Sequence, residues 1–239
     1  NIGLCFLTPH GRFLARVNGK VKGNVLLRKK QYAISETEES IAIAASFLVG
    51  KIANCRKVIE RALRDHALLV DVSMLAQASR SLRDNLRLIR ECRTIEDLMG
   101  FEGSSAKIYF SVFDQLVLHQ KDQFFFRERS RRPPLDNLNS LLSFLYTLLT
   151  SEVSSALETV GLDPYVGFLH QDRPGRPSLA LDLMEELRPV FADRLALTLI
   201  NRNQISGKGF TQKESGGILM DDETRKKVLT AWQERKKEM

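Results

Sequence analysis

The sequence predicts a mainly α protein, in which a short piece of β structure precedes a large all-helical domain. Two runs near the start, IGLCFLT and RFLARVNG, are rich in β-branched, leucine and phenylalanine residues and are joined by Pro9-His10-Gly11, which is typical of a β-hairpin. The segment at 21–29, VKGNVLLRK, is expected to extend this hairpin. From Ser35 onward the apolar residues recur at helical spacing. We therefore assign residues 1–32 to a β piece and residues 33–239 to a helical domain.

Local signals mark where the helices begin and end. Ser35 is followed three residues later by a glutamate, which is the pattern of a capping box, and Thr94 resembles another cap. Asp136 or Asn137 opens a further helix, which Gly161 is placed to end, and Asp221 or Asp222 caps the terminal helix. These signals predict helices over residues 35–55, 71–93, 94–118, 136–161, 178–189, 190–202 and 221–239, with a short hairpin near 210–220.

Composition and charge narrow the class of protein. No run of about 18 apolar residues occurs and no signal peptide is visible, which favours a cytoplasmic protein without a membrane span. The chain has 36 Lys and Arg against 29 Asp and Glu, and the resulting net charge of +7 favours polyanionic partners. The cysteines Cys5, Cys55 and Cys92 form no C-x-x-C pair, so we interpret them as small apolar residues rather than zinc ligands.

Carboxylates and one histidine gather in the segment 167–189, GFLHQDRPGRPSLALDLMEELRP. On a helical wheel Asp182 and Glu185 share a face, and Glu186 is also a neighbour of Asp182, so helical geometry does not separate the two glutamates. Such a face is either solvated or holds a cation. The Pro/Gly-constrained loop before this helix would hold His170 in a fixed relation to it. The core stripe expected on the same helix is Leu179, Leu183, Leu187 and Val190.

Glu102 is a further candidate, because it is followed by the small residues Gly103, Ser104, Ser105 and Ala106. Small residues beside a carboxylate allow close approach either of a substrate backbone or of another helix. A histidine with two or three carboxylates suits Mn²⁺ or Mg²⁺ rather than zinc. With a phosphate substrate, such an ion supports in-line displacement at phosphorus.

Basic residues cluster in RERSRRPP and in the loop QDRPGRPS. Contacts from such residues to phosphates would give affinity with little sequence specificity, and the alternative is a solvated basic loop. We interpret His10, His66 and His119 as structural, because no carboxylate cluster accompanies them. The candidates for nucleic-acid contacts are Lys121, Arg129, Arg131, Arg132, Arg173 and Arg176.

Four long motifs resemble those of one family, the CRISPR-associated endonuclease and integrase of spacer acquisition. They are FEGSSAKIYF, RRPPLDNLNSLLSFLYTLL, DPYVGFLHQDRPGRPSLALDLMEELRP and DDETRKKVLTAWQERKKE, and they stand in the family's order. The resemblance implies that Glu102, His170 and Glu185 are the metal ligands of a helical catalytic domain. It also implies that Asp182 is a second acidic catalytic residue, which supports the site. It selects Glu185 over Glu186. It also implies that the β piece is the remnant of a fuller N-terminal β domain, and that the chain lacks parts of both ends.

The resemblance further implies an activity, in which the 3′-hydroxyl of a short DNA fragment attacks a phosphodiester at the edge of a CRISPR repeat. The fragment thereby becomes a spacer, and Mn²⁺ or Mg²⁺ is the implied cofactor. The implied partners are double-stranded DNA, a second copy of the full-length protein, the small second Cas protein of the integrase complex and a Cas nuclease that trims precursors. Two alternatives stay open: a non-catalytic basic helical DNA-binding scaffold, and a metallohydrolase acting on a small molecule.

Overall fold

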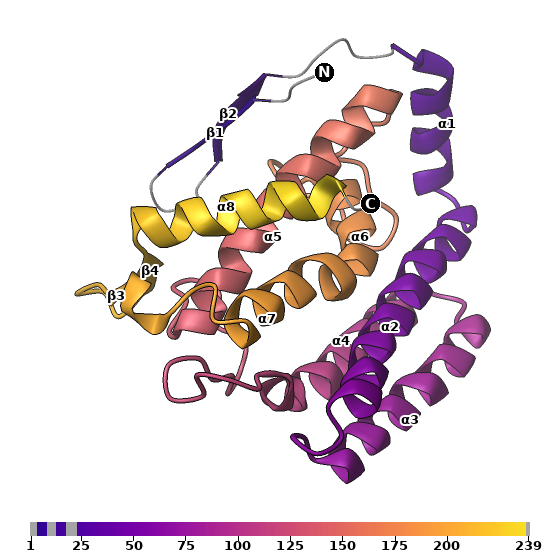
Figure 1. Ribbon diagram of the computed structural model, residues 1–239. Helices are drawn as coiled ribbons and strands as arrows, with labels where there is room; N and C mark the ends of the chain where they lie inside the picture. Colours follow the sequence, from indigo (N-terminus) through magenta and orange to yellow (C-terminus); the bar gives the residue numbers. More distant parts are fainter. Residues whose placement is uncertain (1–3, 9–12, 18–22, 238–239) are drawn as a thin grey trace. The chain divides into compact units, whose positions relative to one another are not determined.

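The computed structural model describes residues 4–8, 13–17 and 23–237, which are mainly helical, as predicted (Figure 1). The main elements are β1 (Leu4–Leu7), β2 (Phe13–Val17), α1 (Val25–Ser35), α2 (Glu39–Asp65), α3 (Val72–Leu88), α4 (Ile95–Ser111), α5 (Asn137–Val160), α6 (Ser178–Leu187), α7 (Arg194–Asn201), β3 (Phe210–Gln212), β4 (Ile218–Met220) and α8 (Asp222–Lys237). Between them lie 3₁₀ turns at Ile89–Glu91, Phe113–Leu116 and Gly207–Gly209, and a π-helical segment at Arg188–Asp193. None of the helices in these ranges is both long enough and apolar enough to cross a membrane.

The chain forms two compact units, each built from three separate segments. Unit 1 comprises Asn1–Asn54, Arg83–Ser105 and Thr147–Arg188, and unit 2 comprises Cys55–Leu82, Ala106–Tyr146 and Pro189–Met239. Helices α2, α3, α4 and α5 each contribute residues to both units. The predicted domain boundary between residues 32 and 33 stays a prediction.

The N-terminal hairpin is confirmed as an antiparallel pair, in which Leu4 lies opposite Val17. Its expected turn at Pro9-His10-Gly11 lies outside the described residues. The expected extension of the hairpin through residues 21–29 is wrong, because helix α1 begins at Val25. The Asn24 side chain accepts a hydrogen bond from the Leu27 amide at 3.1 Å. An N-cap followed by leucine, arginine and lysine residues therefore outweighs the β-forming pattern.

The predicted capping box at Ser35 is also wrong. Ser35 is the last residue of α1, its hydroxyl donates to the Tyr32 carbonyl at 2.8 Å, and α2 begins only at Glu39. The helix expected from 94 to 118 ends at Ser111. The helix expected to end at residue 55 continues to Asp65, and the helix expected from 71 to 93 ends at Leu88. The predicted end at Gly161 is confirmed, and this glycine has a φ of 94°. The confirmed caps are Thr94, Asp136 and Asp221, whose side chains accept from Asp97 N at 3.1 Å, Asn139 N at 2.6 Å and Thr224 N at 2.7 Å.

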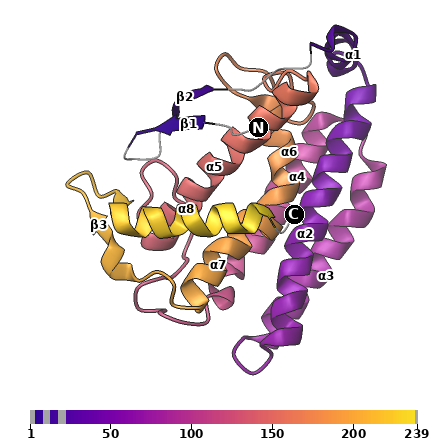
Figure 2. The same ribbon diagram turned by 45° about the horizontal axis from the view of Figure 1, so that its top comes forward.

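Unit 1 positions the segment that carries the histidine. Helix α6 runs beside α5 (Figure 2), and Thr150 Oγ1 contacts Met184 Sδ at 3.1 Å. Buried Gln31 of α1 donates from Nε2 to the carbonyls of Asp163 and Val166, both at 2.8 Å. These contacts fix the position of the chain shortly before His170.

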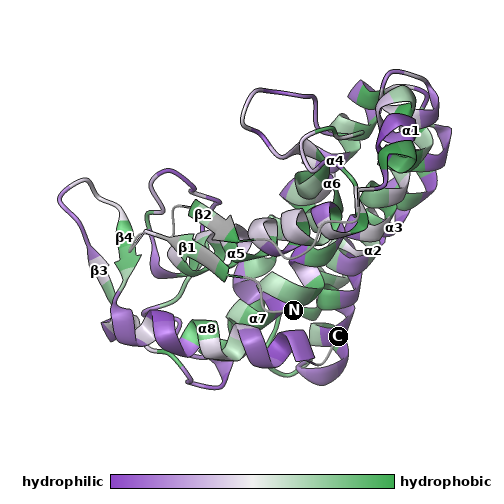
Figure 3. Cartoon of the chain, turned by 90° about the horizontal axis from the view of Figure 1, so that it is seen from above, coloured by the Kyte–Doolittle hydropathy of each residue, from purple (hydrophilic) through white to green (hydrophobic). Residues whose placement is uncertain are grey.

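Unit 2 has an aromatic core. The rings of Phe110 and Phe126 stack with centroids 5.2 Å apart, and Phe191 meets Trp232 edge-on at 4.6 Å. Helix α8 is largely hydrophilic (Figure 3), yet it buries Trp232 on one side. Aromatic pairs of this geometry contribute about 0.5–1.5 kcal/mol beyond their buried area. Val228 and Thr224 of α8 are buried as well, so these three side chains hold the helix to its unit.

Candidate active site

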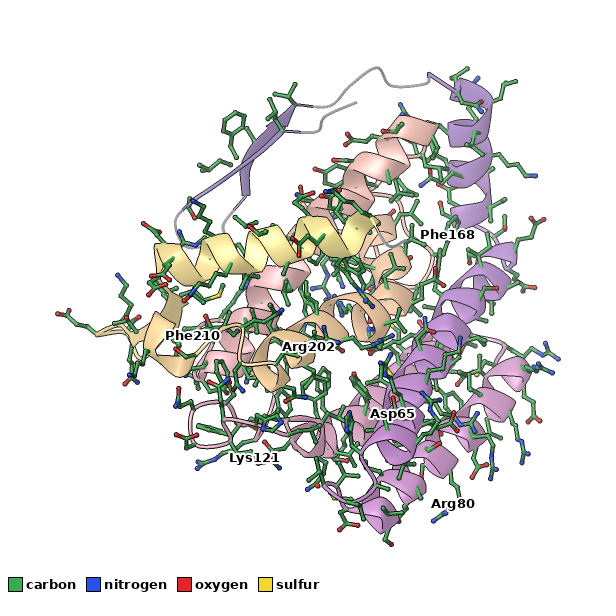
Figure 4. The ribbon with its side chains drawn as sticks, in the orientation of Figure 1. Asp65, Arg80, Lys121, Phe168, Arg202 and Phe210 are labelled. Atoms are coloured by element: carbon green, nitrogen blue, oxygen red, sulfur yellow. The ribbon has the colours of Figure 1, made fainter. Side chains whose placement is uncertain are left out.

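Asp182 organises the loop that leads into α6. Its side chain is fully buried and accepts hydrogen bonds from three consecutive backbone amides, those of Phe168 at 2.6 Å, Leu169 at 2.9 Å and His170 at 2.9 Å. Phe168 is labelled in this loop in Figure 4. Three converging N–H groups satisfy a buried carboxylate without a cation, and they fix the loop to the helix at the same time.

The same carboxylate sets the orientation of the His170 ring. Asp182 Oδ1 lies 2.6 Å from His170 Nδ1, and the His170 side chain is only 19% exposed. A carboxylate beside Nδ1 keeps the proton on that nitrogen, so that Nε2 presents its lone pair. This carboxylate–histidine arrangement is typical of metal-binding histidines, where the second partner fixes the tautomer.

Glu102 and Glu185 share one buried cation, which is the ammonium of Lys51. Lys51 Nζ hydrogen-bonds Glu102 Oε1 and lies 2.7 Å from Glu185 Oε2. Arg188 Nη1 pairs with the other Glu185 oxygen at 2.5 Å. Lys51 is 7% exposed and Glu185 is 2% exposed, whereas the Glu102 side chain is 31% exposed. The two carboxylates are therefore held within a few ångströms of a single nitrogen.

The charges in this cluster stabilise one another. Burial acts to raise the pKa of Glu185, but the positive charges of Arg188 and Lys51 outweigh it and lower that pKa to about 2. His170 acts in the same direction on the pKa of Glu185, so the histidine and this carboxylate interact electrostatically. Burial acts to lower the pKa of Lys51, but Glu185 and Glu102 raise it above its ordinary value. Glu185 and Lys51 are both charged at neutral pH.

The acidic face of α6 is the buried one. Asp182 is 0% and Glu185 is 2% exposed, whereas Leu183 and Leu187 of the expected core stripe are only half-buried. The solvated-face alternative is therefore wrong, and the face holds cations, supplied in this structure by lysine and arginine side chains. Glu186 is half-buried, so burial distinguishes the two glutamates that the helical wheel left equivalent.

The sequence predictions missed Lys51 and Arg188. A signal for Lys51 was present, because it lies three residues after Leu48 and four before Cys55 and so places a charge on the apolar face of α2. Arg188 follows Glu185 at i+3, a spacing that brings side chains together on a helix.

The small residues after Glu102 serve helix packing in unit 1. Asn85 Nδ2 of α3 donates to the hydroxyls of Ser104 at 3.2 Å and Ser105 at 2.9 Å. The structure therefore supports the helix-packing alternative for this stretch.

Arg129 is engaged inside unit 2. Its guanidinium donates to Ser130 O at 2.5 Å, Asn139 Oδ1 at 2.6 Å and Ser143 Oγ at 3.0 Å, and it lies 5.3 Å from the centre of the Tyr146 ring. These contacts give it a structural role. The other five candidates for nucleic-acid contacts are exposed or half-buried: Lys121, Arg131 and Arg132 in unit 2, and Arg173 and Arg176 in unit 1.

Gly167 allows the loop to approach α6. A Cβ at this position would lie 2.8 Å from Ser178 Cβ, 2.9 Å from the Ser178 backbone carbonyl carbon and 2.9 Å from Asp182 Oδ2. We expect Gly167→Ala to destabilise the protein by about 1–3 kcal/mol, as overpacking does. Urea unfolding measures this, with Gly100→Ala as the control, since a Cβ at Gly100 meets no atom within 4 Å. Equal unfolding midpoints for the two variants would show that the loop adjusts freely.

The residue types at this site are ones that bind divalent cations, but in the described part of the chain the structure does not gather them into a complete ligand set. Glu185 Oε2 is buried and lies against the Lys51 ammonium, but no donor among the described residues is aligned to hydrogen-bond it. His170 keeps Nε2 free of the hydrogen bond to Asp182. In the arrangement described, no three His, Cys, Asp or Glu side chains of residues 4–8, 13–17 and 23–237 lie close enough together to hold a metal. Displacement of Lys51 Nζ would release the two carboxylates to complete the set.

Comparison with known proteins shows the family of the chain. The family described as CRISPR associated protein Cas1 matches residues 1–234. The CRISPR-associated endonuclease Cas1 1 of Chlorobaculum tepidum is 50% identical over 238 residues, which cover 99% of this chain and 69% of that protein. The CRISPR-associated endonuclease Cas1 2 of Rhodospirillum rubrum is 52% identical over 241 residues, covering 99% and 70%. The chain therefore belongs to the Cas1 family.

Solved structures show the same fold. A Cas1 protein from Thermotoga maritima superposes with a TM-score of 0.82 at 28% identity, over 98% of this chain and 71% of that one. A casposase bound to its integration product superposes with a TM-score of 0.84 at 25% identity, over 98% of this chain and 64% of that one. The chain thus spans about two thirds of the length of these relatives.

Proposed function

We propose that the chain carries the catalytic centre of a metal-dependent DNA endonuclease and integrase, which joins short DNA fragments to a CRISPR array. In the proposed reaction a 3′-hydroxyl attacks the phosphorus of a phosphodiester. A new P–O bond forms as the existing P–O3′ bond breaks, and the displaced strand leaves with a free 3′-hydroxyl. Water is the nucleophile in place of the 3′-hydroxyl when DNA is cleaved. The observation that carries the proposal is the Asp182–His170 pair in one unit with Glu185 and Glu102, within a Cas1-family chain. The names of the relatives, endonuclease and casposase, support it.

Glu102, Glu185 and Nε2 of His170 would hold Mn²⁺ or Mg²⁺. When bound, such an ion supplies neutralisation of the non-bridging phosphate oxygens and polarises the attacking hydroxyl. Asp182 keeps the proton of His170 on Nδ1 and so leaves Nε2 as an acceptor. Arg188 keeps Glu185 ionised, and Lys51 holds the two glutamates together until metal enters.

The proposed polyanion partner is double-stranded DNA, both as spacer precursor and as repeat. We assign phosphate contacts to the exposed or half-buried residues Lys121, Arg131, Arg132, Arg173 and Arg176, and leave out Arg129 because its donors are used internally. Loss of binding with rising salt concentration measures these contacts.

The proposed protein partners are Cas2, a precursor-trimming Cas nuclease and, for the full-length protein, a second copy. A chain of a partial Cas6-RT-Cas1–Cas2 complex superposes with a TM-score of 0.79 at 27% identity. A relative from Geobacter sulfurreducens, 38% identical, is a fusion of the exonuclease Cas4 with Cas1. The homodimer and the cytoplasmic location stay predictions.

Substitution of the proposed ligands tests the activity. In the full-length protein we expect Glu102→Ala, His170→Ala and Glu185→Ala each to lower Mn²⁺-dependent strand transfer by more than about 100-fold, beyond the 10–100-fold typical of residues that only orient ligands. Glu186→Ala is the matched control, because it removes the adjacent carboxylate of the same helix. Full activity in all three ligand variants would contradict the proposal.

One observation favours the alternative of a non-catalytic DNA-binding scaffold. Lys51 and Arg188 already neutralise Glu185, and a scaffold would need no other cation there. Calorimetric titration with Mn²⁺ separates the two proposals. A scaffold binds no metal at this site, whereas an enzyme binds Mn²⁺ in a manner that depends on Glu185.

A further inference from the structure

Unit 2 contains a pocket that includes none of the residues of the candidate active site. Its volume is about 350 Å³, within the lower part of the range of small-molecule sites. The walls come from the C-terminal end of α2, from the segment at 116–119 and from α7 with the residues after it. Its apolar lining is Val58, Ala62, Leu116, Leu118 and Leu197.

The polar lining of this pocket is predominantly basic. Arginine and histidine side chains, from Arg61, His66, His119, Arg194 and Arg202, oppose a single carboxylate. That carboxylate, Asp65, is already paired, with Arg61 at 3.2 Å and with Arg64 at 2.8 Å. Figure 4 labels Asp65 on α2 and Arg202 just after α7. The pocket therefore combines an apolar surface with an excess of positive and hydrogen-bonding groups.

Two of these polar groups lack a partner. The side chains of Arg202 and His119 make no hydrogen bond or ion pair with any residue in the described part of the chain, whereas His66 interacts electrostatically with Asp65. Both histidines are exposed, and their interpretation as structural residues stays a prediction. Unpaired donors along the wall of an apolar pocket are suited to an anionic ligand, since a guanidinium binds phosphate through paired N–H groups.

We propose that this pocket binds a single nucleotide, either free or at the end of a DNA strand. The arginines take the phosphate, and the aliphatic wall with the imidazole rings packs against the planar base. An apolar wall is not needed for inorganic phosphate, and a volume of about 350 Å³ is that of a small-molecule site. The proposal does not depend on metal at the candidate active site.

Calorimetric titration of the whole chain with deoxynucleoside monophosphates tests the proposal. We expect saturable one-to-one binding that Arg202→Gln weakens by about tenfold or more, because it removes a charged donor to phosphate. His119→Gln serves as a second, independent variant. Arg80→Gln is the matched control, since Arg80 is exposed on α3 in the same unit and does not line the pocket (Figure 4).

Different ligands distinguish the source of the nucleotide. Binding of free monophosphates as tightly as of 5′-phosphorylated oligonucleotides assigns the site to free nucleotides, and binding of the oligonucleotides alone assigns it to strand ends. Equal binding of inorganic phosphate, of an unphosphorylated nucleoside or of a glutamate oligomer would overturn the proposal. So would equal affinities of Arg202→Gln, His119→Gln and the unmodified protein. Glu185→Gln is expected to keep nucleotide binding, which separates this result from failure of the proposed activity.

Discussion

Replacing Asp182 by alanine is expected to destabilise the protein by about 4 kcal/mol, which places it among the most damaging single changes. The carboxylate accepts from three consecutive amides and from the His170 ring. Hydrogen bonds to a charged acceptor contribute about 1.5–3 kcal/mol each, and the total is less than their sum because the loop relaxes. Urea unfolding of the metal-free chain measures this loss, and strand transfer by the full-length protein should fall as well.

Two further variants show whether the loss of stability comes from the hydrogen bonds that the Asp182 carboxylate accepts. Asp172→Ala removes a carboxylate from the same loop, but Asp172 is exposed and accepts only a 3.3 Å contact from the Gly167 amide. It should change the free energy of unfolding little. Asp182→Asn keeps the shape but replaces one acceptor oxygen by a donor, so it should lose most of the same stability. Equal unfolding of the Asp182→Ala and Asp172→Ala variants would contradict the assigned role of Asp182.

Much of the helical pattern could be predicted from local signals. Thr94, Asp136 and Asp221 cap the predicted helices. A short polar side chain that precedes apolar residues at helical spacing usually accepts a hydrogen bond from an amide of the first turn. Ser35 carried the same signal and was misassigned, since the chain has already formed α1 before it reaches Ser35. A capping pattern alone does not reveal whether the residues before it are already helical.

The candidate site was less predictable, because its contacts join residues far apart in the sequence. Lys51 meets Glu102 from 51 positions away, and it meets Glu185 from still farther along the chain. Periodicity indicates which residue interrupts an apolar face, but it does not identify the partner on the facing helix. The helical wheel of α6 likewise placed the carboxylates of Asp182 and Glu185 on one face. It could not show that this face would be buried more deeply than the leucine stripe.

Replacing Lys51 by methionine is expected to destabilise the metal-free protein by about 3 kcal/mol, the lower end of the range for removing one partner of a buried ion pair. Methionine keeps the length of the side chain but leaves Glu185 with Arg188 as its one remaining cation among the ion pairs of the described residues. The partial exposure of Glu102 moderates the cost. Thermal and urea unfolding in the presence of a chelator measure the effect. Lys57→Met on the same helix is the matched control, because Lys57 is exposed.

Added Mn²⁺ should then stabilise the Lys51→Met variant more than the unmodified protein. In the unmodified chain a divalent ion must displace an ammonium that already neutralises Glu102 and Glu185, and the ion-pair energy lost offsets part of the binding energy. In the variant this competing cation is absent, so the same concentration of Mn²⁺ should raise the melting temperature further. Equal shifts in the two proteins would mean that Lys51 and the metal do not share these carboxylates, and that the ligand set must be assembled elsewhere in unit 1.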